Sequence, residues 1–300
     1  MPEARPLPPP GIPAAEVEIT DELVRSLLRS QHPDLAELPL HRFGSGWDNT
    51  TYRLGDDLAV RIPRRRIGAE QIRKEQEWLT LVASGLPIPV GAPIRVGRPE
   101  FGYPWTWSVV PWIDGVSAEG ADPDPGEAAR LGQFLNALHR PGPDDAPRSS
   151  YRGGPLTDRA LSVEERLPRL DTSLLDVSVD EIKDTWHRVK TLPVDRDPVW
   201  LHGDLHARNI VVDGGEIAGV IDWGDLCVGD PATDLAVAWM LFPVSAHGEF
   251  REAYGPVSDA TWERARGWAI FFGVVIVDAG AVDDPVWAEA GARALARACA

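Results

Sequence analysis

Cysteine, lysine and long apolar runs are all scarce in this chain of 300 residues. Its two cysteines, Cys227 and Cys299, form no CxxC motif, so neither a disulfide framework nor a thiolate metal site is expected. The longest strongly apolar stretch, residues 268–277, has about half of the ~20 residues that a membrane-spanning helix needs. The first 13 residues contain six prolines and no apolar signal-peptide core. We therefore expect a cytoplasmic protein whose residues 1–16 form a flexible tail.

Basic residues are also scarce relative to acidic ones. The chain has 46 Asp and Glu against 30 Lys and Arg, a net charge of −16, and only three of its basic residues are lysines. This deficit argues against nucleic acids and anionic membrane surfaces as partners, and it favours a cationic small molecule. The excess of acids is uneven, because residues 1–112 carry a net charge of −1 and residues 113–300 carry −15.

The hydrophobic pattern changes from strand-rich to helix-rich near residues 112–115. In the first part, Thr20 can cap an amphipathic helix, and residues 43–63 alternate as in an antiparallel meander of three strands. A longer helix is predicted from about Ala69 to Ser84, closed by Gly85. This organisation indicates an α+β protein. Further strands are predicted near residues 92–96 and 106–111, and further helices at 131–138, 178–190, 231–242, 258–280 and 285–299.

The polar residues with the clearest chemistry lie between residues 202 and 225. Gly214-Gly215 predicts a two-residue hairpin turn, and counting back from it places Asp222 diagonally across from Asn209, with Cβ atoms about 7–8 Å apart. Amide and carboxylate oxygens are ligands that suit Mg²⁺. We therefore predict a magnesium site on Asn209 and Asp222, with Asp204 beside it on the incoming loop. The predicted register pairs Asp213 with Glu216, Ile210 with Gly219 and Asn209 with Val220.

Two other interpretations of this segment stay open. In an extended loop, His202, Asp204 and His206 would share one face, which is an arrangement that a metal hydrolase could use. Each Gly-Asp pair is also an ordinary turn sequence, and the hairpin could serve structure alone.

The spacing His-x-Asp-x-x-x-x-Asn, followed by an Asp after a short hairpin, is the arrangement of phosphoryl-transferring kinases. Residues 202–209 and 221–225, HGDLHARN and IDWGD, resemble the aminoglycoside phosphotransferase family, which is related to choline and homoserine kinases. Residues 229–236 and 131–139 extend the similarity. The resemblance implies a bilobal protein-kinase-like fold: a small antiparallel-sheet N-lobe with one main helix over residues 17–112, and a larger, mostly helical C-lobe over residues 113–300.

The resemblance also implies transfer of the γ-phosphoryl group of ATP or GTP to a hydroxyl group, with Mg²⁺ as cofactor. Asp204 would orient or deprotonate the hydroxyl, while Asn209 and Asp222 would hold the metal. The acidic C-lobe favours a cationic acceptor, most of all an aminoglycoside-type antibiotic; a macrolide, an amino alcohol or a sugar is the alternative. The candidate acceptor-binding residues are Asp225, Asp278, Asp283, Asp284 and Glu289.

A nucleotide site in the N-lobe is implied as well. Arg61 stands where kinases usually carry a lysine, and Glu75 lies on the apolar face of its helix, where an unpaired carboxylate would be costly. We therefore predict that these two residues pair. The change from lysine to arginine leaves open a kinase-like module that binds nucleotide without catalysis. The other predicted nucleotide contacts are Gly44, Ser45 and Gly46 in a glycine turn, and backbone groups near Pro111 and Ile113 at the hinge between the lobes.

Overall fold

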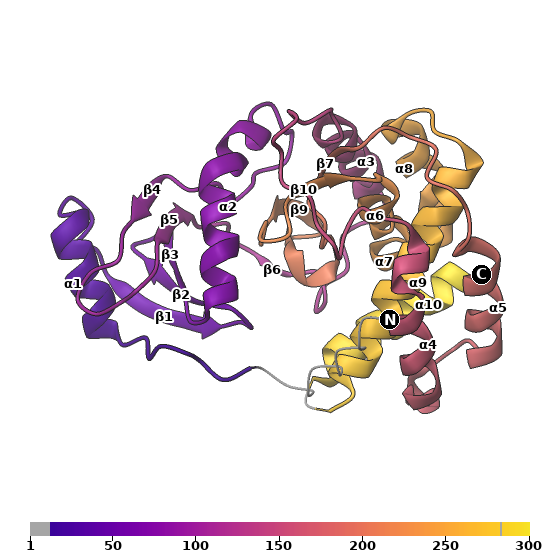
Figure 1. Ribbon diagram of the computed structural model, residues 1–300, viewed down its shortest axis with the longest axis horizontal. Coiled ribbons are helices and arrows are strands. Elements are labelled where there is room, and N and C mark those ends of the chain that lie inside the picture. The colour runs from indigo at the N-terminus through magenta and orange to yellow at the C-terminus, as the bar shows by residue number, and fades with distance from the viewer. Residues whose placement is uncertain (1–12, 283) are drawn as a thin grey trace.

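A five-stranded antiparallel sheet forms the first part of the molecule in the computed structural model, which describes residues 13–282 and 284–300 (Figure 1). The strand order is β1-β2-β3-β5-β4. One face of the sheet buries Tyr52 and Leu54 in a cluster shared with helix α1, which Thr20 caps by accepting a hydrogen bond from Leu23 N at 3.2 Å. Most of the tail expected over residues 1–16 lies outside the described residues. The bounds are α1 Asp21–Gln31, β1 Leu40–Ser45, β2 Asn49–Leu54, β3 Leu58–Pro63, β4 Arg95–Gly97 and β5 Trp107–Pro111.

Helix α2 (Arg66–Ala83) stands between this sheet and the rest of the molecule (Figure 1). It begins before the predicted Ala69, because tertiary contacts fix its first turn on the loop between β1 and β2. Arg65 binds Asp48 Oδ1 at 2.8 Å, and a Cβ added at Gly68 would lie 2.5 Å from the Asp48 carbonyl oxygen. The helix closes at Gly85, whose φ of +85° only glycine adopts easily.

The second part of the chain is mainly helical, so the predicted α+β fold class is confirmed. The helix expected over residues 231–242 divides at Ala236, where Trp239 N bonds back to Ala236 O in a tight three-residue turn. Helices α4 and α8 and the short strands β6 and β10 are absent from the sequence prediction, since segments this short carry little periodicity. No helix within residues 13–282 and 284–300 is long and apolar enough to cross a membrane. The bounds are β6 Val116–Ser117, α3 Glu127–Leu138, α4 Ala160–Arg166, α5 Val179–Val189, β7 Val199–Leu201, β10 Cys227–Gly229, α6 Ala232–Leu235, α7 Val237–Leu241, α8 His247–Tyr254, α9 Asp259–Gly280 and α10 Pro285–Cys299.

The predicted hairpin is present as β8 (Ile210–Asp213) and β9 (Glu216–Val220), joined by Gly214-Gly215. Its predicted register holds for the two pairs next to the turn, Asp213 with Glu216 and Val212 with Ile217, and is wrong beyond them. A β-bulge adds Ala218 to β9, so Ile210 pairs with Val220 instead of Gly219. Ile221 N then donates to Asn209 O at 2.9 Å, which brings Asp222 one residue closer to Asn209 than the predicted register does.

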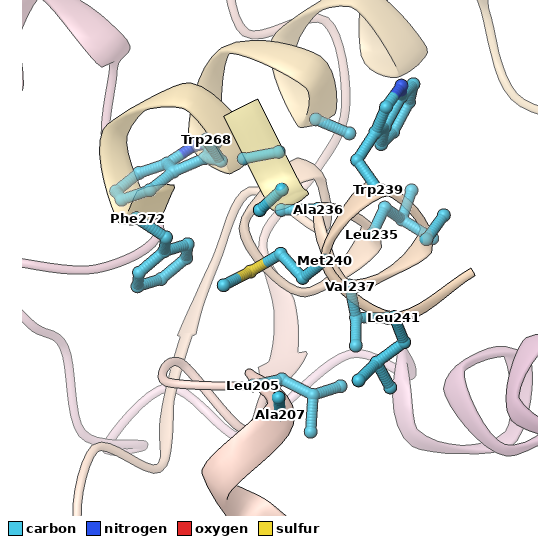
Figure 2. Packing of buried hydrophobic residues seen from close by; sticks show 14 of the residues in the cluster. Leu205, Ala207, Leu235, Ala236, Val237, Trp239, Met240, Leu241, Trp268 and Phe272 are labelled. Atoms are coloured by element: carbon cyan, nitrogen blue, oxygen red, sulfur yellow. The ribbon is translucent and has the colours of Figure 1, made fainter. Parts of the chain in front are cut away.

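The loop that follows β7 is anchored to the helical core (Figure 2). Leu205 and Ala207 point into a buried cluster with Val237, Met240 and Leu241 of α7, while Trp268 and Phe272 of α9 lie on the other side of Met240. Leu205 and Ala207 are buried and alternate with Asp204 and His206 along the loop. Because apolar burial fixes every second residue, the polar residues between them are held toward the opposite side.

Candidate active site

The backbone of the loop that carries Asp204 is held by a buried carboxylate. Asp234 of α6 accepts hydrogen bonds from His202 N at 2.7 Å and from Gly203 N at 2.9 Å. The Asp234 side chain has no exposed surface, and it also contacts His139 Nε2 at 3.4 Å. Gly203 has a φ of +86°, and a Cβ there would lie 2.6 Å from Asp225 O. The charge-assisted hydrogen bonds to Asp234 and the close approach of Gly203 to Asp225 together fix this loop next to the residues that follow β9.

His202 has a structural position. Its Nδ1 accepts a hydrogen bond from Asp204 N at 3.2 Å, its Nε2 lies 3.0 Å from Ile221 O, and its ring packs on Trp223. Both ring nitrogens are therefore occupied by backbone groups, and His202 does not share a face with Asp204 as the hydrolase alternative requires. Within the part of the chain that the structure describes, no three His, Cys, Asp or Glu side chains form a metal-binding group.

The Asp204 carboxylate lies between two basic side chains. Its Oδ1 is 2.6 Å from Arg152 Nη2, and its Oδ2 is 3.2 Å from His206 Nε2. Burial acts to raise the pKa of Asp204, but the charges of Arg152 and His206 outweigh it and hold the pKa well below its usual range. Asp204 is therefore a carboxylate at neutral pH, able to accept a hydrogen bond from a hydroxyl group.

The side chain of Asn209 is attached to the backbone of Asp204. Its Nδ2 donates to Asp204 O at 2.8 Å, which fixes the direction of the amide. Its Oδ1 is buried and, among the described residues, has no hydrogen-bond partner. Such an orphaned acceptor is rare in protein interiors and calls for a ligand.

Asp222 follows the hairpin and has an unusual backbone conformation. Its φ is +60°, which is uncommon for a residue other than glycine and is often found at functional sites. The Asp222 side chain is 57% exposed, so it faces solvent from the end of the hairpin. The amide oxygen of Asn209 and the carboxylate of Asp222 are a donor set that fits Mg²⁺.

Arg61 of β3 joins this end of the site to helix α2. Its Nη1 lies 2.5 Å from Glu75 Oε2, and its Nη2 lies 3.0 Å from Asp222 Oδ1. Glu75 has no exposed surface; burial raises its pKa, and Arg61 opposes that rise. The predicted contact between Arg61 and Glu75 is present. The planar guanidinium spans two carboxylates, which a single ammonium group does less well.

The glycine turn of residues 44–46 joins β1 to β2, and the hinge at residues 111–113 lies beside the start of β3. Gly46 N closes the turn on Asn49 O at 2.9 Å, and a Cβ at Gly44 would meet no atom within 4 Å, so the turn has open space beside it. Ser45 Oγ is 3.1 Å from Thr50 Oγ1. At the hinge, Pro111 pairs with Leu58, while Trp112 N is bonded to Asp57 O. Ile113 N has no partner within the described ranges.

Three of the predicted acceptor residues, Asp225, Asp278 and Asp284, are already paired with arginines. Asp225 lies 3.0 Å from Arg152 Nε, whereas Asp278 contacts Arg166 at 3.2 Å and Arg169 at 2.8 Å. Asp284 binds Arg208 at 2.7 Å and caps α10. Glu289 is exposed on α10, and Asp283 lies outside the described residues. Asp225, Asp278 and Asp284 are therefore each balanced by an arginine of the same chain.

Sequence analysis missed two residues of this site. Asp234 lies in the motif of residues 229–236, which was noted for similarity without a role. Arg152 comes from an irregular segment between α3 and α4, so no periodicity or motif marks it. Its contact with Asp204, 52 residues later in the chain, is visible only in three dimensions.

The two-part architecture and the arrangement of Asp204, Asn209 and Asp222 agree with the protein-kinase-like class that the sequence resembles. The chain belongs to the phosphotransferase enzyme family, whose model matches residues 39–268. It is 32% identical over 127 residues to an aminoglycoside 3'-phosphotransferase of Escherichia coli; the match covers 39% of this chain and 44% of that protein, so it spans less than half of that relative's length. The family resemblance predicted from residues 202–225 is thus confirmed.

Solved structures share the fold over almost the whole chain. The GDP complex of aminoglycoside 2'-phosphotransferase-IIIa has a TM-score of 0.68 at 20% identity, covering 93% of this chain and 99% of that one. The macrolide 2'-phosphotransferase MphH of Brachybacterium faecium has a TM-score of 0.57 at 19% identity, covering 91% and 97%. At these identities the likeness shows the bilobal kinase-like fold.

Proposed function

We propose that this protein transfers the γ-phosphoryl group of ATP or GTP to a hydroxyl group of a small molecule. The observation that carries the proposal is the unpaired, buried Oδ1 of Asn209, held by the backbone of Asp204 at the foot of the hairpin that ends in Asp222. Family membership supports the same reaction class. We also propose that the protein acts in the cytoplasm.

Asp204 would accept the hydrogen bond of the acceptor hydroxyl and orient it for in-line attack. Because its pKa is low, Asp204 is a weak base; orientation and charge are its main contributions, and full removal of the proton before attack is not required. Asn209 and Asp222 would hold Mg²⁺, which neutralises charge on the transferring phosphate when bound.

We assign the nucleotide to the N-lobe, residues 17–112, and the acceptor to the C-lobe, residues 113–300. Arg61, fixed by Glu75, faces the metal end and would contact the phosphates, while Gly44, Ser45 and Gly46 would cover them. The N–H of Ile113, next to Pro111, has no partner among the described residues and is the donor that we assign to the nucleotide base.

An aminoglycoside-type compound is the acceptor that we propose first. Several relatives of the family are aminoglycoside phosphotransferases, and the C-lobe carries a net charge of −15. Asp225, Asp278, Asp283 and Glu289 are the carboxylates that we propose for its amino groups. A less highly charged acceptor such as a macrolide is the second candidate, because Asp225, Asp278 and Asp284 already bind arginines and a polycation must compete with them.

A panel assay tests the function and separates these acceptors. Purified protein with Mg²⁺ and either ATP or GTP is incubated with an aminoglycoside, a macrolide, an amino alcohol or a sugar, and release of ADP or GDP is measured with mass analysis of the product. We expect phosphorylation of at least one acceptor, with a requirement for Mg²⁺. Absence of both transfer and nucleotide hydrolysis across the panel contradicts the proposal.

Substitution of Arg61 tests its place at the phosphate end. Arg61→Gln leaves the buried Glu75 unpaired, so we expect a loss of about 3–5 kcal/mol in the free energy of unfolding and a large fall in kcat/KM for the nucleotide. Arg61→Lys keeps one charge contact, and we expect it to retain folding and turnover within about tenfold. Arg95→Lys, in an exposed pair with Asp34, is the matched control. Equal losses in the Gln and Lys variants contradict this account.

A further inference from the structure

Arg152 connects the two acids nearest the acceptor side of the site. Its Nη2 lies 2.6 Å from Asp204 Oδ1, and its Nε lies 3.0 Å from Asp225 Oδ2. The guanidinium also covers the ring of Phe272 on α9, 5.2 Å from the centroid. Only 17% of the Arg152 side chain is exposed. The Arg152 guanidinium therefore contacts the loop of Asp204, the segment after β9 and helix α9.

The backbone around Arg152 is fixed as firmly as its side chain. Ser149 Oγ accepts a hydrogen bond from Arg152 N at 3.1 Å. On the other side, Gly153 N donates to Thr233 Oγ1 at 3.2 Å, and Gly153 O accepts from Asp230 N at 2.8 Å. Gly153 has a φ of +68° and packs so closely on Gly229 that a Cβ would lie 2.7 Å from its Cα. Arg152 is thus presented by an ordered segment anchored beside α6.

The charges show what this contact achieves. Asp204 and Asp225 are like charges attached to neighbouring segments, since a Cβ added at Gly203 would lie 2.6 Å from Asp225 O. Without a cation between them, their repulsion would turn the Asp204 side chain away from its present direction. The nearly planar fork of arginine occupies Oδ1 of Asp204 and leaves Oδ2, with His206, as the edge that meets an incoming hydroxyl.

We propose that Arg152 is a positioning residue for phosphoryl transfer: by bridging Asp204 and Asp225 it fixes the orientation of the Asp204 carboxylate toward the acceptor hydroxyl. This inference rests on the proposed function, since the role concerns the same reaction. Arg152 comes from the segment between α3 and α4, which contains no recognised motif. This segment therefore sets the geometry of Asp204 in the motif of residues 202–209.

The test is a double-substitution cycle with steady-state kinetics. Arg152→Gln, Arg152→Lys, Asp225→Asn and the double variant Arg152→Gln/Asp225→Asn are compared with the wild-type protein on an acceptor chosen from the panel. Nucleotide hydrolysis with water as acceptor is measured in parallel. Arg95→Gln is the matched control, because it also removes an arginine from a pair with an aspartate, far from the site on β4. Thermal unfolding of every variant establishes that it is folded.

We expect Arg152→Gln to lower kcat by about 10- to 100-fold, since small errors in the placement of a reacting group have effects of this size. KM for the nucleotide should stay within about twofold, because Arg152 does not contact the N-lobe residues of the site. Arg152→Lys should recover part of kcat. The double variant should be no slower than Arg152→Gln alone, because the contact of Asp225 is already lost.

Three results would overturn the inference. The first is a folded Arg152→Gln variant that keeps kcat within twofold of wild type, and the second is a pair of losses that multiply in the double variant. If Arg152→Gln does not fold, the test uses Arg152→Lys and Asp225→Asn instead. The third overturning result is then a wild-type kcat in both of these variants. These leave phosphoryl transfer itself intact. A wild-type protein that consumes no nucleotide with any acceptor or with water overturns the proposed function, and the transfer role of Arg152 with it.

Discussion

Replacing Asp204 by Asn should reduce kcat by about 10²- to 10⁴-fold, which is the range for loss of a positioned acid–base group. The amide keeps the size and shape of the side chain, and its oxygen still accepts from Arg152, so the fold and the loop should persist. The amide lacks the negative charge and proton affinity of the carboxylate that meets the hydroxyl. The measurement is steady-state transfer to an accepted substrate, with nucleotide binding followed separately by thermal shift.

Nucleotide binding provides the internal control for this variant. Because Asp204 is assigned to the acceptor and not to the phosphates, the shift in unfolding temperature on adding nucleotide should remain close to that of wild type. Asp213→Asn, at the exposed end of β8, gives the same chemical change outside the site. If Asp204→Asn keeps more than about a tenth of wild-type kcat, well above the range expected for such a group, its assignment is wrong.

Replacing Asp222 by Asn should slow transfer by at least about 10²-fold, because charge stabilisation by a bound metal contributes several kcal/mol to such reactions. The substitution removes the only full negative charge from the proposed ligand pair of Asn209 and Asp222. It also removes one of the two partners of Arg61. Unlike Asp204→Asn, this variant should bind the nucleotide–magnesium complex more weakly.

A magnesium titration separates the metal role from a general loss of structure. In Asp222→Asn, the Mg²⁺ concentration for half-maximal turnover should rise, and added Mg²⁺ should restore part of the rate. Asp213→Asn should titrate like wild type. An unchanged titration together with wild-type turnover contradicts the assignment of Asp222 to the metal.

Local patterns in the sequence predicted most of the elements that surround the site. Helical spacing placed Glu75 on an apolar face, and the structure buries it against Arg61. Gly214-Gly215 predicted the hairpin, because a two-residue turn of this kind has few alternatives. The register failed at Ala218, since a bulge is decided by packing that no local pattern reports.

Local sequence patterns could not predict contacts between segments that are distant in the chain. Composition placed an excess of acids in the C-lobe, but it carried no information on their partners. The structure shows that Asp225, Asp278 and Asp284 each bind an arginine, so the formal charge of the lobe overstates the charge presented to an acceptor. Asp234 and Arg152 were missed for the same reason, because their roles depend on loops that meet only in the folded chain.

The alternation of Leu205 and Ala207 with Asp204 and His206 has a consequence for altering substrate preference. The loop that carries Asp204 is attached to the helical core because Leu205 and Ala207 pack in the cluster formed by α7 and α9 (Figure 2). The arginines that pair with the acids proposed for acceptor binding come from other segments, at residues 152, 166, 169 and 208. Libraries that vary Arg166 and Arg169 therefore change the electrostatics of the acceptor side while the interior support of Asp204 is left untouched.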